Sequence, residues 1–183
     1  YNDLVLPWQG VQEDNNIRRD TSLERLAKLK PVFDKSPRAT MTAGNSTPLT
    51  DGAATVLLAS EEWARQRGLP VLAYLTYARA AAVDFVNTDG LLMAPVFSVS
   101  SMLKDAGHAL QDFDLYEIHE AFAAQTLATL KAWESEEFCR ERLGRDEAMG
   151  SIDRDKLNTR GGSIAIGHPF AATGARIMMA LAK

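Results

Sequence analysis

Short apolar segments of strand length alternate along this chain with segments that carry the periodicity and end signals of helices. The strand-like segments are residues 53–60, 71–83 and 114–118. Helices are expected at residues 21–30, 61–67, 98–106, 120–131, 133–145 and 169–183. This alternation is typical of an α/β layer fold with a mostly parallel or mixed sheet. We therefore expect the α/β class.

Size and composition restrict the class of protein further. The 183 residues are enough for one substantial domain and barely enough for two. The chain contains one cysteine, Cys139, so a disulfide framework is impossible and a cysteine-based zinc cluster is not expected. The net charge of −4 argues against a dedicated nucleic-acid-binding protein, and no apolar run approaches the ~18 residues of a membrane span. The first residue is Tyr1 rather than methionine, so we expect a piece of a longer protein.

Residues 18–38 form a basic segment on a chain that is acidic as a whole. They carry seven basic and three acidic side chains. Such a segment attracts polyanionic small ligands. A solvated helix face explains the same pattern, and for the segment taken alone that explanation is favoured.

His119 follows the expected strand 114–118 and opens the next helix. In an open α/β sheet, ligands bind in the crevice at the carboxyl ends of the strands. A histidine that merely caps a helix accounts equally well for this position. A zinc-protease helix motif is excluded, because Ala123 stands where that motif needs a second histidine one turn further on.

His168 lies in the glycine-rich run GGSIAIGHPFAATGAR at residues 161–176. Glycines let a backbone approach a ligand closely, and an imidazole there can hydrogen-bond an oxyanion or accept a proton from a thiol or hydroxyl. The glycine spacing differs from that of a dinucleotide-binding fingerprint. For the loop taken alone, a structural glycine loop with an incidental histidine is the favoured explanation. The residues alone predict a ligand-binding α/β half-site with two histidines and no nucleophile beside them.

Four motifs together resemble the thiolase family. Residues 161–176 are similar to its glycine-rich histidine motif, and TAGNSTPLTDGAA at residues 42–54 is similar to its turn on the coenzyme A side. HEAFA at residues 119–123 resembles its Asn-Glu-Ala-Phe block, and LAKLKP at residues 26–31 resembles the end of its loop domain. His119 stands where most thiolases have asparagine. With the charged segment near residues 133–145, it resembles the 3-ketoacyl-CoA thiolase subunits of fatty-acid oxidation complexes, which are related to the trifunctional-enzyme β subunit.

The resemblance implies the thiolase-like α/β fold, with a mixed sheet covered by helices on both faces. Residues 1–38 would form the end of the loop domain on the coenzyme A side. Residues 39–183 would form the C-terminal domain without its last strands, so the chain would be roughly half of a thiolase subunit. An unpaired sheet edge would result, and we expect marginal stability, self-association or rescue by the missing segments.

The resemblance also implies a reaction. Thiolases cleave a 3-ketoacyl-CoA with coenzyme A to acetyl-CoA and a shortened acyl-CoA, or run the reverse condensation, using a nucleophilic and a protonating cysteine. By resemblance, His168 activates the nucleophile and donates to an oxyanion, while His119 serves the oxyanion hole directly or through water. Arg18 would lie near the nucleotide end of coenzyme A. Thr47 would contact its pantetheine, and Phe122 would line the pantetheine tunnel.

Neither family cysteine falls in the motifs found here, and Cys139 is expected to be an ordinary, partly buried thiol. We therefore expect an acyltransferase of fatty-acid β-oxidation as the full-length protein and an inactive chain on its own. The alternatives are a non-catalytic coenzyme A-binding or scaffolding module and a biosynthetic condensing enzyme. The resemblance implies coenzyme A and acyl-CoA as substrates, no permanently bound cofactor and no metal.

The resemblance further implies an assembly and a cellular location. A homodimer or tetramer is expected, and in the oxidation-complex type a hydratase–dehydrogenase subunit is a partner. The bacterial cytoplasm is the expected compartment, with the mitochondrial matrix as the alternative. The acyl-chain length is not determined by these residues.

Overall fold

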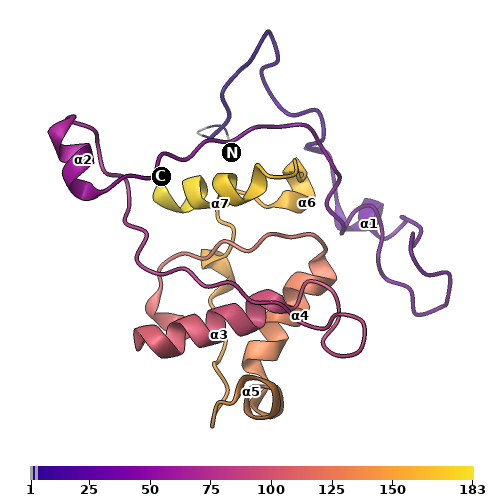
Figure 1. Ribbon diagram of the computed structural model, residues 1–183. Helices are drawn as coiled ribbons and strands as arrows, with labels where there is room; N and C mark the ends of the chain where they lie inside the picture. The colour runs from indigo at the N-terminus through magenta and orange to yellow at the C-terminus, as the bar shows by residue number, and fades with distance from the viewer. Residues whose placement is uncertain (1, 3) are drawn as a thin grey trace. The chain divides into compact units, whose positions relative to one another are not determined.

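The computed structural model describes residue 2 and residues 4–183, coloured along the chain in Figure 1. The chain divides into two compact units. The first contains the residues up to Tyr74 together with Glu117–Phe122 and Asn158–Lys183, and the second contains Leu75–Tyr116 and Ala123–Leu157. Each unit is therefore assembled from segments that are distant in the sequence. The expected domain boundary between residues 38 and 39 stays a prediction.

The second unit is built on packed helices. These are α3 (Ala94–Ala106), α4 (Ala123–Glu134) and α5 (Glu136–Leu143), with the short 3-10 turns η1 (Leu110–Asp112) and η2 (Arg154–Lys156). Local signals set their ends. Gly107 after α3 and Gly144 after α5 are left-handed, with φ of 70° and 61°, a conformation that glycine adopts without steric cost. The helices expected near residues 98–106, 120–131 and 133–145 are thus confirmed, with shifted ends.

The core of the second unit lies between these helices. Its buried side chains include Val96, Leu103, Leu130, Trp133 and Cys139. The indole N–H of Trp133 donates to the carbonyl of Val96 at 3.4 Å, which joins α4 to α3. Cys139 is completely buried rather than partly buried as expected, because its position on α5 faces the core.

The first unit consists largely of extended chain and short helices (Figure 1). α1 (Leu23–Leu26) and α2 (Glu61–Gln66) begin at serines whose hydroxyls accept backbone N–H groups, while α6 (Ser163–Ile166) and α7 (Thr173–Ala182) lie near the C-terminus. α7 begins at Thr173, not at the expected Pro169, because the intervening Ala171 takes a left-handed φ of 63°.

The expected mixed sheet is not formed in the described residues. Segments 53–60 and 71–83 run without ladder partners, and Tyr116 in segment 114–118 makes one isolated bridge, to Leu157. Apolar side chains on the two long segments are exposed; Leu57 and Leu72 are 70% and 60% exposed. The physical reason is that a strand-like sequence favours extended backbone, whereas a ladder also needs a neighbouring strand in register.

Candidate active site

His119 is held in the first unit by hydrogen bonds on both sides of its short segment. The side chain of Asn158 accepts from the N–H of Ile118 at 2.9 Å and donates to the Ile118 carbonyl at 3.0 Å. On the other side, the N–H of Thr47 donates to the carbonyl of Ala121 at 3.0 Å. Asn158 has a φ of 51°, a left-handed conformation that asparagine tolerates better than most residues. The backbone at His119 is thereby clamped between two other segments.

His168 is placed by the turn between α6 and α7. Its N–H donates to the carbonyl of Pro48 at 2.9 Å. Gly167 precedes it with a φ of 97°, and a Cβ at Gly167 would lie 2.3 Å from Cγ2 of Thr50. Only glycine therefore lets the histidine turn pass so close to the extended chain at Thr50.

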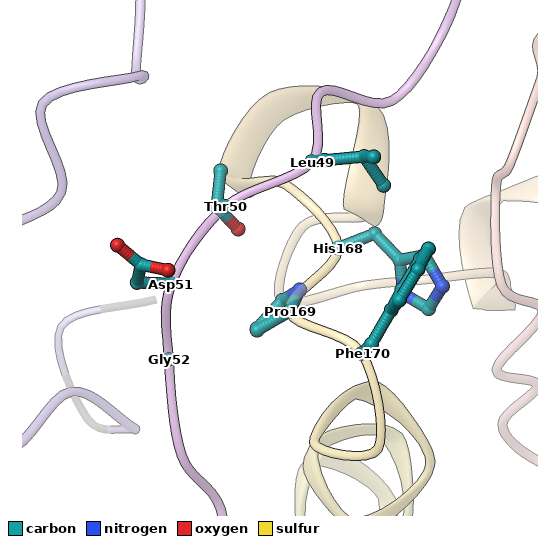
Figure 2. A pocket seen from close by; sticks show the side chains of 7 residues that line it. All are labelled: Leu49, Thr50, Asp51, Gly52, His168, Pro169 and Phe170. Carbon is teal, nitrogen blue, oxygen red and sulfur yellow. The ribbon is translucent and has the colours of Figure 1, made fainter.

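The two imidazoles lie side by side with their rings tilted. Their ring centroids are 4.1 Å apart with the planes inclined by 38°, and both side chains are half-buried. His168 also lines a cavity of about 330 Å³ formed by residues 49–52 and 168–170 (Figure 2). In that view the Phe170 ring stands beside the His168 ring, with centroids 5.1 Å apart.

Each histidine has a hydroxyl group at its Nδ1 atom. Nδ1 of His119 lies 2.8 Å from Oγ of Ser163, and Nδ1 of His168 lies 2.6 Å from Oγ1 of Thr173. Both hydroxyl residues are buried, Ser163 completely. Each Nδ1 atom thus has a hydrogen-bond partner within the protein, and Nε2 is the ring nitrogen that can interact with a substrate.

Arg176 and Glu120 interact with His119, and Glu117 interacts with both of these charged side chains. Nη2 of Arg176 donates to Oγ of Ser163 at 2.9 Å. The carboxylate of Glu120 accepts from Asn158 Nδ2 at 2.7 Å and from the N–H of Ile164 at 3.2 Å. Burial raises the pKa of Glu117, while Arg176 opposes that shift. Burial also lowers the pKa of Arg176, with Glu117 and Glu120 opposing, and a guanidinium stays protonated in proteins.

The pKa of His119 is lowered from its ordinary value. The main cause is burial, followed by the neighbouring His168 and Arg176, with Glu120 acting in the opposite direction. His119 is therefore biased toward the neutral imidazole, which carries one N–H donor and one acceptor nitrogen. Such a group donates a hydrogen bond to a developing negative charge without a full positive charge of its own.

The three other sequence-predicted residues lie in the same unit. Oγ1 of Thr47 donates to the carbonyl of Ser163 at 2.6 Å, the same residue whose hydroxyl contacts His119. Phe122 is half-buried and packs edge-on against Phe33, with centroids 5.8 Å apart. The guanidinium of Arg18 donates to the nearby carbonyl of Asn15 at 3.3 Å.

Sequence reasoning missed the residues that support the histidines. Ser163, Thr173 and Arg176 lie in the glycine-rich run, but no role was expected for them. One available signal was Arg176 itself, a single charge within the otherwise apolar helix α7. Asn158 had no such signal, because its partners are about 40 residues away in the sequence.

Other kinds of site are not found in the described part of the chain. No group of three or more histidine, cysteine, aspartate or glutamate side chains there is arranged to hold a metal ion. Among the same residues, no helix combines the length and the apolar character needed to cross a membrane.

Two family models that match most of the chain identify its family. The family model for the thiolase C-terminal domain matches residues 69–183, which include both histidines, and the thiolase N-terminal domain model matches residues 7–62. This chain belongs to the thiolase family. The resemblance of its four motifs is therefore confirmed.

Similar proteins agree with this assignment. A 3-ketoacyl-CoA thiolase from Serratia proteamaculans is 51% identical over 168 residues, covering 92% of this chain and 38% of that protein. A 3-ketoacyl-CoA thiolase from Yersinia pseudotuberculosis is 51% identical over 170 residues, covering 93% of this chain and 38% of that protein. The chain thus spans 38% of the length of these relatives.

Solved thiolase structures match the fold. The dimeric peroxisomal thiolase of Saccharomyces cerevisiae is 35% identical with a TM-score of 0.73, and the match covers 93% of this chain and 38% of that one. Human mitochondrial 3-ketoacyl-CoA thiolase in complex with CoA is 34% identical with a TM-score of 0.70 and the same coverage. The expected thiolase fold is therefore confirmed as a partial match.

Proposed function

We propose that this chain supplies the histidine half of a 3-ketoacyl-CoA thiolase site, an acetyl-CoA C-acyltransferase of fatty-acid β-oxidation. The observation that carries this proposal is the pairing of His119 and His168 at 4.1 Å, from two distant segments of a thiolase-family chain. The 51% identity to 3-ketoacyl-CoA thiolases supports the substrate class. The full site cleaves a 3-ketoacyl-CoA with coenzyme A to acetyl-CoA and a shortened acyl-CoA.

His168 acts as the base for the nucleophile. Its Nε2 takes the proton of a cysteine thiol, and the thiolate attacks the 3-keto carbon. The C2–C3 bond then breaks, the acetyl-CoA enolate leaves and a second cysteine protonates it. The thiol of free coenzyme A finally takes the acyl group from the first cysteine. Both cysteines belong, in this proposal, to parts of the protein outside these 183 residues.

His119 stabilises negative charge on a reacting oxygen. A neutral imidazole that donates from Nε2 is suited to this role, and the lowered pKa of His119 favours that neutral form. Loss of one donor of this kind typically costs ~2.7–4 kcal/mol of transition-state stabilisation.

Coenzyme A enters as a substrate and is bound by three further residues. Thr47 contacts the pantetheine and Phe122 lines its tunnel; both lie in the unit that holds the histidines. Arg18 lies near the nucleotide end, where the basic segment 18–38 attracts its phosphates. The bound CoA of the similar human structure supports this choice of ligand.

The finer features of the fold and assembly follow from the same proposal. Segments 53–60 and 71–83 become strands of a mixed sheet covered by helices on both faces when neighbouring strands are supplied. Residues 1–38 belong to the loop domain and residues 39–183 to the C-terminal domain. The protein forms a homodimer or tetramer in the bacterial cytoplasm and joins a hydratase–dehydrogenase subunit. The dimeric yeast structure supports self-association.

A chimera tests the catalytic proposal directly. The matching 38% of the Serratia proteamaculans thiolase is replaced by this chain, and thiolysis of acetoacetyl-CoA and of longer 3-ketoacyl-CoA substrates is measured. We expect activity that falls by about 10²–10³-fold in His168→Gln and His119→Gln. His108→Gln is the matched control, because this exposed histidine lies in the second unit and is expected to leave kcat unchanged.

A folded, dimeric chimera without activity would contradict the catalytic proposal. It would favour the second candidate, a non-catalytic coenzyme A-binding or scaffolding module of the thiolase fold. One observation favours that candidate: the single cysteine of the chain is completely buried. Titration of the chimera with coenzyme A would then separate binding from scaffolding.

A further inference from the structure

A chain of two hydrogen bonds ends at Nδ1 of His119. Arg176 Nη2 lies 2.9 Å from Oγ of Ser163, and the same Oγ lies 2.8 Å from Nδ1 of His119. Arg176 is half-buried and Ser163 is completely buried. The direction of these two hydrogen bonds is therefore set mainly by the protein groups rather than by water.

The chemistry of the three groups assigns the proton positions. A guanidinium has only donors, so Ser163 Oγ must accept from Arg176. The single hydroxyl proton of Ser163 is buried and needs an acceptor, since an unmade hydrogen bond there costs about 1–3 kcal/mol. Of the two side chains that contact this oxygen in the described residues, only His119 is able to accept. The hydroxyl therefore donates to Nδ1, and the ring proton of neutral His119 lies on Nε2.

His168 has the opposite environment. Thr173 Oγ1 lies 2.6 Å from Nδ1 of His168 and 3.4 Å from the carbonyl of Pro169. Thr173 therefore has an acceptor for its hydroxyl proton other than the imidazole, which Ser163 lacks among its side-chain contacts, and its oxygen is able to accept the Nδ1–H of His168. That arrangement leaves Nε2 of His168 with a free lone pair.

We propose that Arg176 and Ser163 are positioning residues that hold His119 in the Nε2–H tautomer, opposite to the Nδ1–H tautomer of the facing His168. The stacked pair then presents one donor and one base from two chemically identical side chains. When two groups of the same kind have different environments, one can act as an acid or donor and the other as a base. The catalytic meaning rests on the proposed function, whereas the tautomers themselves do not.

Two acidic residues interact with Arg176, the first donor of the hydrogen-bond relay Arg176–Ser163–His119. Glu117 and Glu120 both interact favourably with the guanidinium, which opposes the cost of its burial. Glu120 is itself tied to Asn158 and to the backbone of Ile164. Arg176 therefore has a favourable interaction with a carboxylate, Glu120, whose own position is fixed by hydrogen bonds.

Nitrogen NMR tests the tautomers without any substrate. The chain is labelled with ¹⁵N-histidine, and its three histidines are assigned with single His→Gln variants. Near neutral pH we expect the ring nitrogen shifts of an unprotonated Nδ1 and a protonated Nε2 for His119, and the reverse for His168. Protonated Nδ1 on neutral His119, or the same tautomer on both rings, would overturn the proposal.

Variants test the role of the relay. In Ser163→Ala we expect the His119 signals to move toward a mixture of tautomers. Ser46→Ala is the matched control: it removes a buried hydroxyl of the same unit that has no hydrogen-bond partner in the described residues, and should leave His119 unchanged. Unchanged His119 signals in Ser163→Ala would contradict a positioning role.

Kinetics of the chimera provide a second readout. Ser163→Ala is expected to lower kcat by up to about 10²-fold with little change in KM, since it disturbs a donor used in the transition state. Equal kcat in Ser163→Ala and in the unsubstituted chimera would contradict the relay even when His119→Gln is inactive. The thiolase proposal fails separately, through full activity of His119→Gln and His168→Gln.

Discussion

At the scale of single residues, His119 links the site to pH. Burial, and then the neighbouring His168 and Arg176, lower its pKa below the ordinary 6.5. The unfolded chain therefore binds this proton at higher pH than the folded chain does, and stability falls as the pH drops below about 6.5 toward the lower folded-state pKa. We expect the urea midpoint to decrease between pH 7 and pH 5.5 by more than it does in His119→Gln. Parallel decreases in the two proteins would contradict this account.

Two buried threonines provide a matched test of hydrogen-bonded and unpaired hydroxyls. Thr173 contacts His168 Nδ1, whereas Oγ1 of Thr129 has no hydrogen-bond partner in the described residues. Thr173→Val is expected to lower the free energy of unfolding by about 1–2 kcal/mol, because Nδ1 of His168 loses its partner. Thr129→Val is expected to be neutral or stabilising. Urea denaturation measures both, and equal effects would argue against the Thr173–His168 bond.

At the scale of elements, two glycines near α6 and α7 should respond in opposite ways to alanine. A Cβ at Gly162 would lie 1.9 Å from Oε2 of Glu120, a carboxylate held by two hydrogen bonds. We expect Gly162→Ala to destabilise the chain by about 1–3 kcal/mol. Gly174 is exposed within α7 with nothing near its missing Cβ, so Gly174→Ala should stabilise by about 0.5–1 kcal/mol. Thermal unfolding distinguishes the two, and stabilisation by both would show that Glu120 moves freely.

The element scale also shows how much of the fold is locally determined. α3 and α5 end at the glycines their sequences suggest, and Ser60 and Ser135 cap α2 and α5 as local hydrogen-bonding rules require. No sheet forms among the described residues, where segment 53–60 is an apolar run of strand length without a partner strand. Helix hydrogen bonds close within four residues, whereas strand hydrogen bonds need a second segment.

For the whole molecule, we expect no thiolysis by this chain alone. Cys139 is completely buried in α5, with its Sγ 3.5 Å from the carbonyls of Ala132 and Trp133. A thiol in such a place is shielded from substrates and reagents. The 183-residue chain should show no cleavage of acetoacetyl-CoA, and Cys139 should react with a thiol reagent only after denaturation. The chimera assayed in parallel is the positive control, and measurable thiolysis by the chain would contradict the prediction.

Most helices, the family and the two histidines could be predicted from the sequence, since each is encoded in a short run of residues such as HEAFA or GGSIAIGHP. The helix α6 (Ser163–Ile166) was not predicted. The folded structure was needed to show that His119 lies beside His168, and that Ser163, 44 residues beyond His119, contacts its Nδ1 atom. Sequence motifs show which side chains are present and in what order along the chain. The pairing of distant groups, and the proton each nitrogen carries, depends on how the folded chain brings buried donors and acceptors together.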